Sequence, residues 1–129
     1  MPNTVTQRTL KGSGASKLVI RLINIVSDGS EESALVIYDN SALVADVTKG
    51  SLIKVLASGS SCVCRLEWDQ TTDSPICSFD PSNSQELCFE DFGGISNPAG
   101  TGATGDILLT TSALDSGDEV TLVLYIRQD

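Results

Sequence analysis

Short apolar segments rich in branched residues recur along the whole chain, and clusters of Gly, Asn, Asp, Ser and Thr separate them. Segments of this length are typical of β-strands, and the polar clusters between them are typical of turns. Frequent short strands without intervening helices predict an all-β fold, a single β-sandwich of jelly-roll type. We expect about eight strands, at residues 17–26, 33–39, 51–58, 61–69, 75–80, 85–91, 106–112 and 118–128.

The last of these segments alternates regularly between apolar and polar positions. Successive side chains of a strand point to opposite faces, so such a segment presents one face to a core. We expect the buried face to comprise Val120, Leu122, Leu124 and Ile126, and the opposite face Thr121, Val123, Tyr125 and Arg127. Helical signals are weak, and we expect at most one short turn within 40–50, capped by Asn40 or Ser41.

Charge divides the chain into two parts. The net charge is −9 over 129 residues, a length that fits one domain, yet residues 1–27 hold four basic residues and no acidic one. We therefore expect an extended basic N-terminal arm at 1–16 and an acidic β-sandwich domain at 17–129. The arm is either a frayed tail or a segment that docks on an acidic neighbour. Because Thr4 to Leu10 has strand character, this segment can instead pair with a sheet edge of a partner or of its own body.

The same composition argues against several partners. A net negative charge disfavours nucleic-acid binding, which needs basic residues to displace phosphate counterions. No run of about eighteen apolar residues occurs, so no membrane span is expected. The N-terminal segment lacks the apolar core of a secretory signal, and we expect synthesis and folding in a reducing cytoplasm.

A Gly-x-Gly-x-x-Gly motif, GTGATG at 100–105, raises the question of a nucleotide site. A dinucleotide-binding loop leaves a strand and opens a helix, whose N-terminus faces the phosphates. Here the loop-like GGISNPA precedes the motif, the strand-like DILLTT follows it, and no basic residue occurs between Arg65 and Arg127. We interpret the glycines as part of a long connection between two strands, and we expect no cofactor.

The chain has four cysteines, Cys62, Cys64, Cys77 and Cys88. Structural zinc sites use Cys-x-x-Cys pairs, whereas Cys62 and Cys64 are two residues apart on the apolar face of an expected strand. The favoured interpretation is free thiols buried in the core. A metal site remains an alternative, as does a disulfide, for instance between Cys77 and Cys88.

The sequence contains no histidine. This absence excludes Ser-His-Asp and Cys-His nucleophilic systems and removes the commonest general base near neutral pH. Paired carboxylates can still hydrolyse glycosides, but most acidic residues fall in turn segments such as SDGSEES and DSGDE, where capping and solubility explain them. No segment matches the calcium-binding Asp-x-Asp-x-Asp-Gly loop. We therefore expect a protein that is not an enzyme and has no metal ligands.

Carbohydrate-binding modules usually offer exposed aromatic side chains as a platform for sugar rings. Trp68 lies on the apolar face of its expected strand and is assigned to the core. Tyr38 and Tyr125 remain as the main exposed candidates, and neither lies in a loop.

A large part of the chain resembles small virion-structural proteins of tailed bacteriophages. The similarity rests on KLVIRLINIVSDGSEESALVIYD, on CRLEWD, and on DFGGISNPAGTGATGDILLTT followed by the closing SGDEVTLVLYIR, and it leaves out most of the arm. The resemblance implies a β-sandwich or jelly-roll decoration (cement) protein on the outer capsid surface of the virion, made and assembled in the host cytoplasm. It carries over no individual functional residue.

The function that follows from this resemblance is non-enzymatic: the protein would bridge neighbouring subunits of the major capsid protein and stabilise the head. Candidate capsid-binding residues in the arm are Arg8, Lys11 and Lys17 for polar contacts and Leu10 as an apolar anchor. Self-association as a homodimer or homotrimer would suit symmetric capsid positions. The alternatives are a carbohydrate-binding or adhesin-type module of a phage or bacterial surface and, third, a small carboxylate-based hydrolase.

Overall fold

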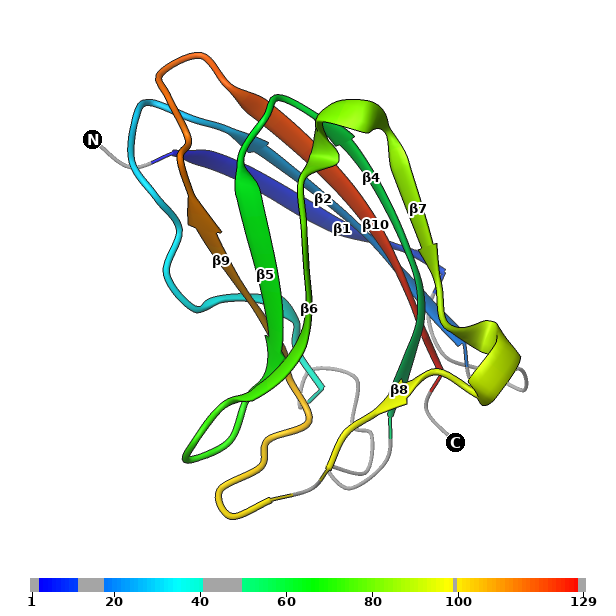
Figure 1. The fold of residues 1–129 in the computed structure, drawn as a ribbon. Coiled ribbons are helices and arrows are strands. Elements are labelled where there is room, and N and C mark those ends of the chain that lie inside the picture. Colours follow the sequence, from blue (N-terminus) through cyan, green and yellow to red (C-terminus); the bar gives the residue numbers. More distant parts are fainter. Residues whose placement is uncertain (1–2, 12–17, 41–49, 99, 128–129) are drawn as a thin grey trace.

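The computed structural model describes residues 3–11, 18–40, 50–98 and 100–127, which form two antiparallel sheets packed face to face (Figure 1). The larger sheet has the strand order β1-β2-β10-β4-β7, and β8 also pairs with β4. The smaller sheet has the order β3-β9-β5-β6. The strands are β1 (Thr4–Lys11), β2 (Leu18–Val26), β3 (Leu35–Tyr38), β4 (Ser51–Gly59), β5 (Val63–Trp68), β6 (Ser74–Phe79), β7 (Gln85–Cys88), β8 (Ile95–Ser96), β9 (Ile107–Ser112) and β10 (Glu119–Arg127).

This strand order is that of a jelly roll, as the sequence predicts. Two four-stranded sheets, β2-β10-β4-β7 and β3-β9-β5-β6, interleave along the chain, so that most connections pass from one sheet to the other. Each of the eight expected segments coincides with one of these eight strands, and only β4, which ends at Gly59, and β6, which begins at Ser74, extend one residue beyond their segments. The fold class is therefore an all-β sandwich.

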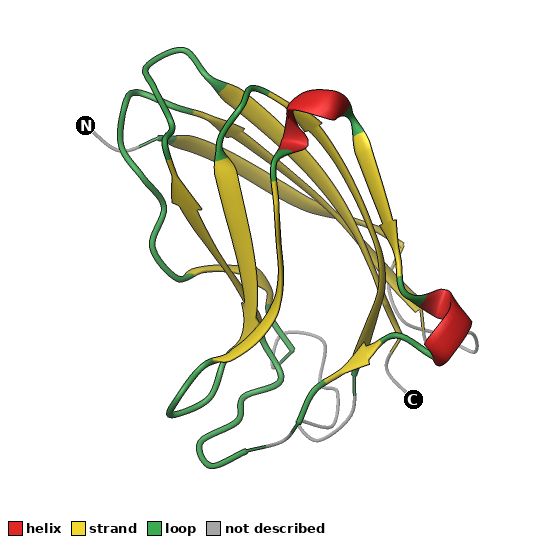
Figure 2. Cartoon of the chain, viewed as in Figure 1, coloured by secondary structure: helices red, strands yellow, loops and turns green. Residues whose placement is uncertain are grey.

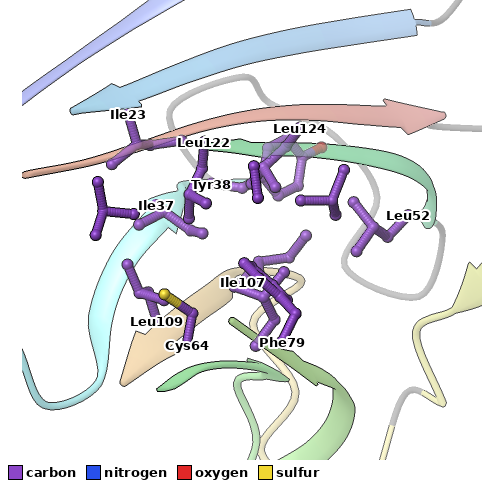
Figure 3. Close-up of a cluster of buried hydrophobic side chains, with 14 of the residues drawn as sticks. Ile23, Ile37, Tyr38, Leu52, Cys64, Phe79, Ile107, Leu109, Leu122 and Leu124 are labelled. Atoms are coloured by element: carbon purple, nitrogen blue, oxygen red, sulfur yellow. The ribbon is translucent and has the colours of Figure 1, made fainter. Parts of the chain in front are cut away.

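The core lies between the two sheets (Figure 3). Strand β10 contributes every second side chain to it, and these four side chains have no solvent exposure, as the alternation predicts: Val120, Leu122, Leu124 and Ile126. Strand β5 does the same from the smaller sheet with Cys64, Leu66 and Trp68. Burial of these apolar side chains supplies the main favourable free energy of folding.

Two strands were not among the eight expected. Residues 4–11, within the predicted arm, form β1, which pairs antiparallel with β2. Of the states that the sequence left open for this segment, pairing with an edge of its own body is the one present. The second is the two-residue β8, which lies in the long connection before β9.

The expected strand at 85–91 is shorter than predicted. It ends at Cys88, because Phe89 leaves the extended conformation and the single-turn helix η3 (Glu90–Phe92) follows. A second single-turn helix, η2 (Pro81–Asn83), begins after Asp80, whose carboxylate accepts a hydrogen bond from the Ser82 N–H. These are the helices of the described residues (Figure 2). The turn predicted within 40–50 lies almost wholly outside them.

One glycine is required where β4 meets β10. Gly59 has φ +134°, a conformation that disfavours L side chains, and it pairs with Val120. A Cβ atom there would overlap the carbonyl oxygen of Glu119 and lie 2.9 Å from the Cα of Val120. Backbone atoms of a central strand cannot move aside as a flexible side chain can.

We predict that Gly59→Ala lowers the free energy of unfolding in urea by several kcal/mol, since it adds steric overlap to backbone strain. The matched control is Gly93→Ala, at φ +86° with no atom within 4 Å of the added Cβ. In this control the free energy of unfolding should fall by only about 1 kcal/mol, the cost of placing an L residue in the left-handed backbone conformation. Equal losses for the two variants would contradict the close approach at Gly59.

Candidate functional site

The predicted arm contributes an edge strand to the larger sheet. Strand β1 pairs with β2 from Thr4 to Lys11, with a register shift between Thr9 and Lys11. Leu10 stands at this bulge and opposes no residue of β2, and its side chain is 47% exposed. Arg8 is exposed as well, and its partner across the pair is Leu22. Lys17 and the side chain of Lys11 lie outside the described part of the chain.

Arg21 fastens β1 to the body of the sandwich. Its Nη1 and Nη2 donate to Thr9 Oγ1 at 3.0 Å and to Gln7 Oε1 at 2.7 Å, both on β1. Its Nε donates to the carbonyl oxygen of Ile37 on the smaller sheet, at 3.1 Å. Partial burial lowers the pKa of Arg21, but its ordinary value is so high that the guanidinium stays charged. Arg21 of β2 therefore holds β1 in place and also links the larger sheet directly to the smaller one.

The four sheet edges differ in how well they are protected. β3 and β7 have four residues each, and β6 contains Pro75, which cannot donate a backbone hydrogen bond. β1 has eight residues and no proline, and no acidic residue occurs in it. Among the described strands it is the longest edge and the one most suited to accept a further strand.

The glycine motif at 100–105 lies in a loop that runs into β9, with no helix in the described residues around it. The Gly100 N–H donates to Gln70 Oε1 at 3.1 Å, and the Thr71 N–H donates to the carbonyl oxygen of Thr101 at 2.9 Å. A Cβ at Gly102 would overlap Thr71 Oγ1, so glycine permits the two loops to approach. The interpretation as a connection between strands is confirmed.

Carboxylates gather at this end of the sandwich. Asp106 Oδ1 accepts from the Asn40 N–H at 2.7 Å, and Asp69 Oδ2 accepts from Thr104 Oγ1 at 2.8 Å. Burial raises the pKa of Asp106, and the nearby charges of Asp39 and Asp69 act in the same direction. Within the described residues, no group of three or more acidic, Cys or His side chains has an arrangement that fits a metal ion.

Carboxylates at the opposite end order the turns. Glu31 accepts from the Leu114 N–H and from Thr111 Oγ1, both at 2.9 Å. Asp118 Oδ2 accepts from the Asp115 N–H at 2.9 Å. Hydrogen bonds lower the pKa of two further carboxyl groups, that of Asp28 through Ser30 and that of Asp80 through Ser82. As expected from the turn sequences, these carboxylates cap loops.

The aromatic side chains do not form an exposed platform among the described residues. Trp68 is 1% exposed, which confirms its assignment to the core. The expectation that Tyr38 is exposed is wrong: it has no solvent exposure, because a register shift between Val36 and Tyr38 turns both Ile37 and Tyr38 inward. Tyr125 is half-buried on the outer face of the larger sheet, and Lys54 Nζ lies over its ring, 5.1 Å from the centroid.

All four cysteines are free. Cys62 and Cys64 are buried, as predicted, and their sulfur atoms lie 3.8 Å apart, while Cys77 is half-buried against the core. Burial raises the pKa of Cys62 and Cys64, and it raises that of Cys77 to about 11. The expectation of burial is wrong for Cys88, which is exposed because its side chain is on the outer face of β7, opposite Lys54.

A surface that sequence reasoning missed is the outer face of the larger sheet. Apolar side chains from three adjacent strands lie half-buried there, among them Leu22, Leu56 and Val123. The mainly apolar segment at 17–26 already indicates this surface. A strand with a single face in the core needs apolar residues only at alternate positions, so the additional apolar residues of this segment must lie on its outer face. No helix of the described residues is long and apolar enough to cross a membrane.

No protein-family model matches this sequence, and the search of curated proteins gave no match. Among the solved structures that are similar at low identity are the following two. One is the family 11 carbohydrate-binding module from Clostridium thermocellum in complex with a β-1,3-1,4-mixed-linked tetrasaccharide, with a TM-score of 0.37, 11% identity, and coverage of 97% of this chain and 82% of that one. The other is CoII HppE in complex with substrate, with a TM-score of 0.35 and 7% identity, where 92% of this chain spans about half (51%) of that one. These TM-scores are too low for either likeness to assign a function.

The thiols provide a direct test of this arrangement. We predict that Ellman's reagent at about pH 8 modifies Cys88 rapidly in the folded protein and the other three cysteines slowly. Cys88 is exposed, whereas the raised pKa values of Cys62, Cys64 and Cys77 keep these buried thiols protonated at that pH. In guanidinium chloride all four react. A rapidly reacting thiol that persists in Cys88→Ser would contradict the core described above.

Proposed function

We propose that this chain is a non-enzymatic structural protein that binds other protein surfaces through β1, as a decoration protein on the outer capsid surface of a tailed phage. The observation that carries the proposal is the exposed edge of β1, eight residues long, with Leu10 projecting at its bulge. An edge of this kind supports strand addition by a partner, in which main-chain hydrogen bonds supply affinity and side chains supply specificity. The phage capsid as partner comes from the sequence resemblance.

Charge supports the same surface. The chain is acidic overall, but residues 1–27 contain four basic residues and no acidic one. The basic residues are Arg8, Lys11, Lys17 and Arg21. A basic edge on an acidic body favours approach to an acidic surface in one orientation. In this proposal Leu10 is the apolar anchor on the capsid, and Lys11 and Lys17 supply polar contacts.

The carbohydrate-binding alternative has less support. Sugar rings stack on open aromatic faces, but Tyr38 is buried, and Lys54 lies over the ring of Tyr125. The described residues thus offer no free aromatic platform comparable to the exposed β1 edge.

The test is co-sedimentation with empty capsids that lack this protein, from a tailed phage that encodes it. We predict saturable binding at an integral number of copies per capsid asymmetric unit. Leu10→Ser weakens it about tenfold or more, because an apolar anchor at the centre of a contact contributes on the order of 1–2 kcal/mol.

The matched control is Val63→Ser on β5 of the smaller sheet, since Val63 is 48% exposed against 47% for Leu10. This variant should bind as the parent does. If Leu10→Ser and Val63→Ser weaken capsid binding equally, β1 is not the docking edge. If the parent protein does not bind capsids, the proposed capsid function is refuted.

A further inference from the structure

The outer face of the larger sheet is unusually apolar for a surface in contact with solvent. Strand β2 buries alternate residues in the core and presents apolar residues outward as well. The outward apolar side chains of the face are Leu18, Ile20, Leu22 and Val26 of β2, Leu56 of β4, and Val123 and Tyr125 of β10. The outer face of the smaller sheet has the charged Arg65 and Glu67 and the polar Thr110 between its apolar Val36 and Val63. A contiguous apolar patch of this kind marks an interaction surface.

One row of five side chains runs across this face from strand to strand. It has apolar residues in its middle, a positive charge at one end and a negative charge at the other. Cross-strand pairing places Arg8, Leu22, Val123, Leu56 and Glu86 side by side on β1, β2, β10, β4 and β7. Val123 is at the centre of the row, with a leucine on either side and a charge at each end. Glu86 Oε1 lies 3.7 Å from Lys54 Nζ, and Arg8 has no ion-pair partner among the described residues.

We infer that this face binds a second copy of the chain, with a twofold axis that runs along β10 through Val123. Rotation about that axis exchanges the two ends of the row. Arg8 of each copy then faces Glu86 of the other, Leu22 faces Leu56, and Val123 faces its own copy. A twofold axis across the strands would instead place Arg8 against Arg8 and Glu86 against Glu86, although it would also place Glu119 against Arg127. Glu119 and Arg127 each already have a hydrogen-bond partner within one copy, whereas Arg8 has no ion-pair partner among the described residues, so the pairing of Arg8 with Glu86 favours the first orientation.

The surface next to Leu56 has a shape that accepts the opposing leucine. A groove of about 250 Å³ is lined by Leu56, Val123, Thr121, Ser58 and Glu86. In the proposed dimer Leu22 of the second copy projects into this groove, and by symmetry each copy supplies one leucine and one groove. An isologous contact requires this kind of self-complementarity.

The available area is sufficient for a modest dimer. Neighbouring strands are about 4.8 Å apart and rise about 3.3 Å per residue, so the five strands offer on the order of 500 Å² per copy. The two copies together bury about 1,000 Å², near the lower limit for a specific interface. Glu119 and Arg127 face their own counterparts across this axis, but each has a partner within its own copy: Glu119 Oε2 accepts from Asn24 Nδ2 at 2.9 Å, and Arg127 Nη2 donates to the carbonyl oxygen of Gly93 at 2.9 Å.

Sedimentation equilibrium of the free protein tests this inference without any capsid, so its outcome is independent of the proposed function. We expect a monomer–dimer equilibrium with a dissociation constant of about 1–100 μM. Arg8→Glu and Glu86→Arg each raise that constant at least tenfold, because each places like charges together twice in a dimer. The double variant carries exchanged charges and returns to within about threefold of the parent, as expected for a direct pair.

Arg65→Glu and Glu67→Arg are matched controls on the outer face of the smaller sheet. Arg65 Nε lies 3.4 Å from Glu67 Oε2, so these changes disrupt a surface ion pair much as Glu86→Arg disrupts that of Lys54. They should leave the dissociation constant unchanged, and thermal unfolding of every variant verifies the fold. A parent that stays monomeric at about 200 μM, or a dimer that ignores both Arg8→Glu and Glu86→Arg, overturns the inference.

Cross-linking tests the position of the axis. In a Cys88→Ser background, Val123→Cys places one thiol from each copy at the twofold axis, and we expect oxidised glutathione to convert it into a covalent dimer. Ser112→Cys, exposed on the smaller sheet, serves as the control and should stay monomeric. Cross-linking of Ser112→Cys but not of Val123→Cys overturns the proposed face.

Discussion

The pairing of β10 with both β2 and β4 is the interaction on which the rest of the structure depends. The C-terminal strand joins β2 over nine residue pairs, from Glu119 with Val26 to Arg127 with Leu18, and its other side joins β4. Four of its side chains are fully buried in the core, so hydrogen bonding and apolar burial act on the same residues. Because β10 pairs with one side of β2, β1 can pair only with the other side. β1 therefore becomes the last strand of this path, and its outer edge is exposed.

Much of this fold could be predicted from the sequence. Alternation with period two predicts β5 and β10 because each has one face in the core, and turn residues predict where most strands end. The local sequence does not decide the conformation of β1, since this short polar segment becomes a strand only when β2, the next element of the chain, offers it an edge. Tyr38 could not be placed, because the bulge that turns it inward depends on its register with Ile107 in β9. Register shifts of this kind arise from long-range pairing, and no local pattern encodes them.

The surfaces that support function were visible only in part. The basic residues of 1–27 are plain in the sequence, but Arg21 belongs to β2 and binds Thr9, Gln7 and Ile37, so it cannot serve as a free contact. The row from Arg8 to Glu86 joins five strands that lie between residues 4 and 127 of the chain, and it exists only after the sheet has formed. If both proposals hold, a dimer carries two β1 edges on opposite sides. Two linked edges would bind a repeating capsid surface more tightly than either alone.

Hydrogen exchange of the protein on capsids tests the central claim, that β1 is the docking edge, most directly. The amides of β1 that point away from β2 have no strand partner among the described residues, so they should exchange rapidly in the free protein. On capsids the account predicts slower exchange of these outward-pointing amides within Thr4–Lys11, with no change in the edge strand β6 of the other sheet. Protection that appears elsewhere while β1 exchanges as fast as before would contradict it.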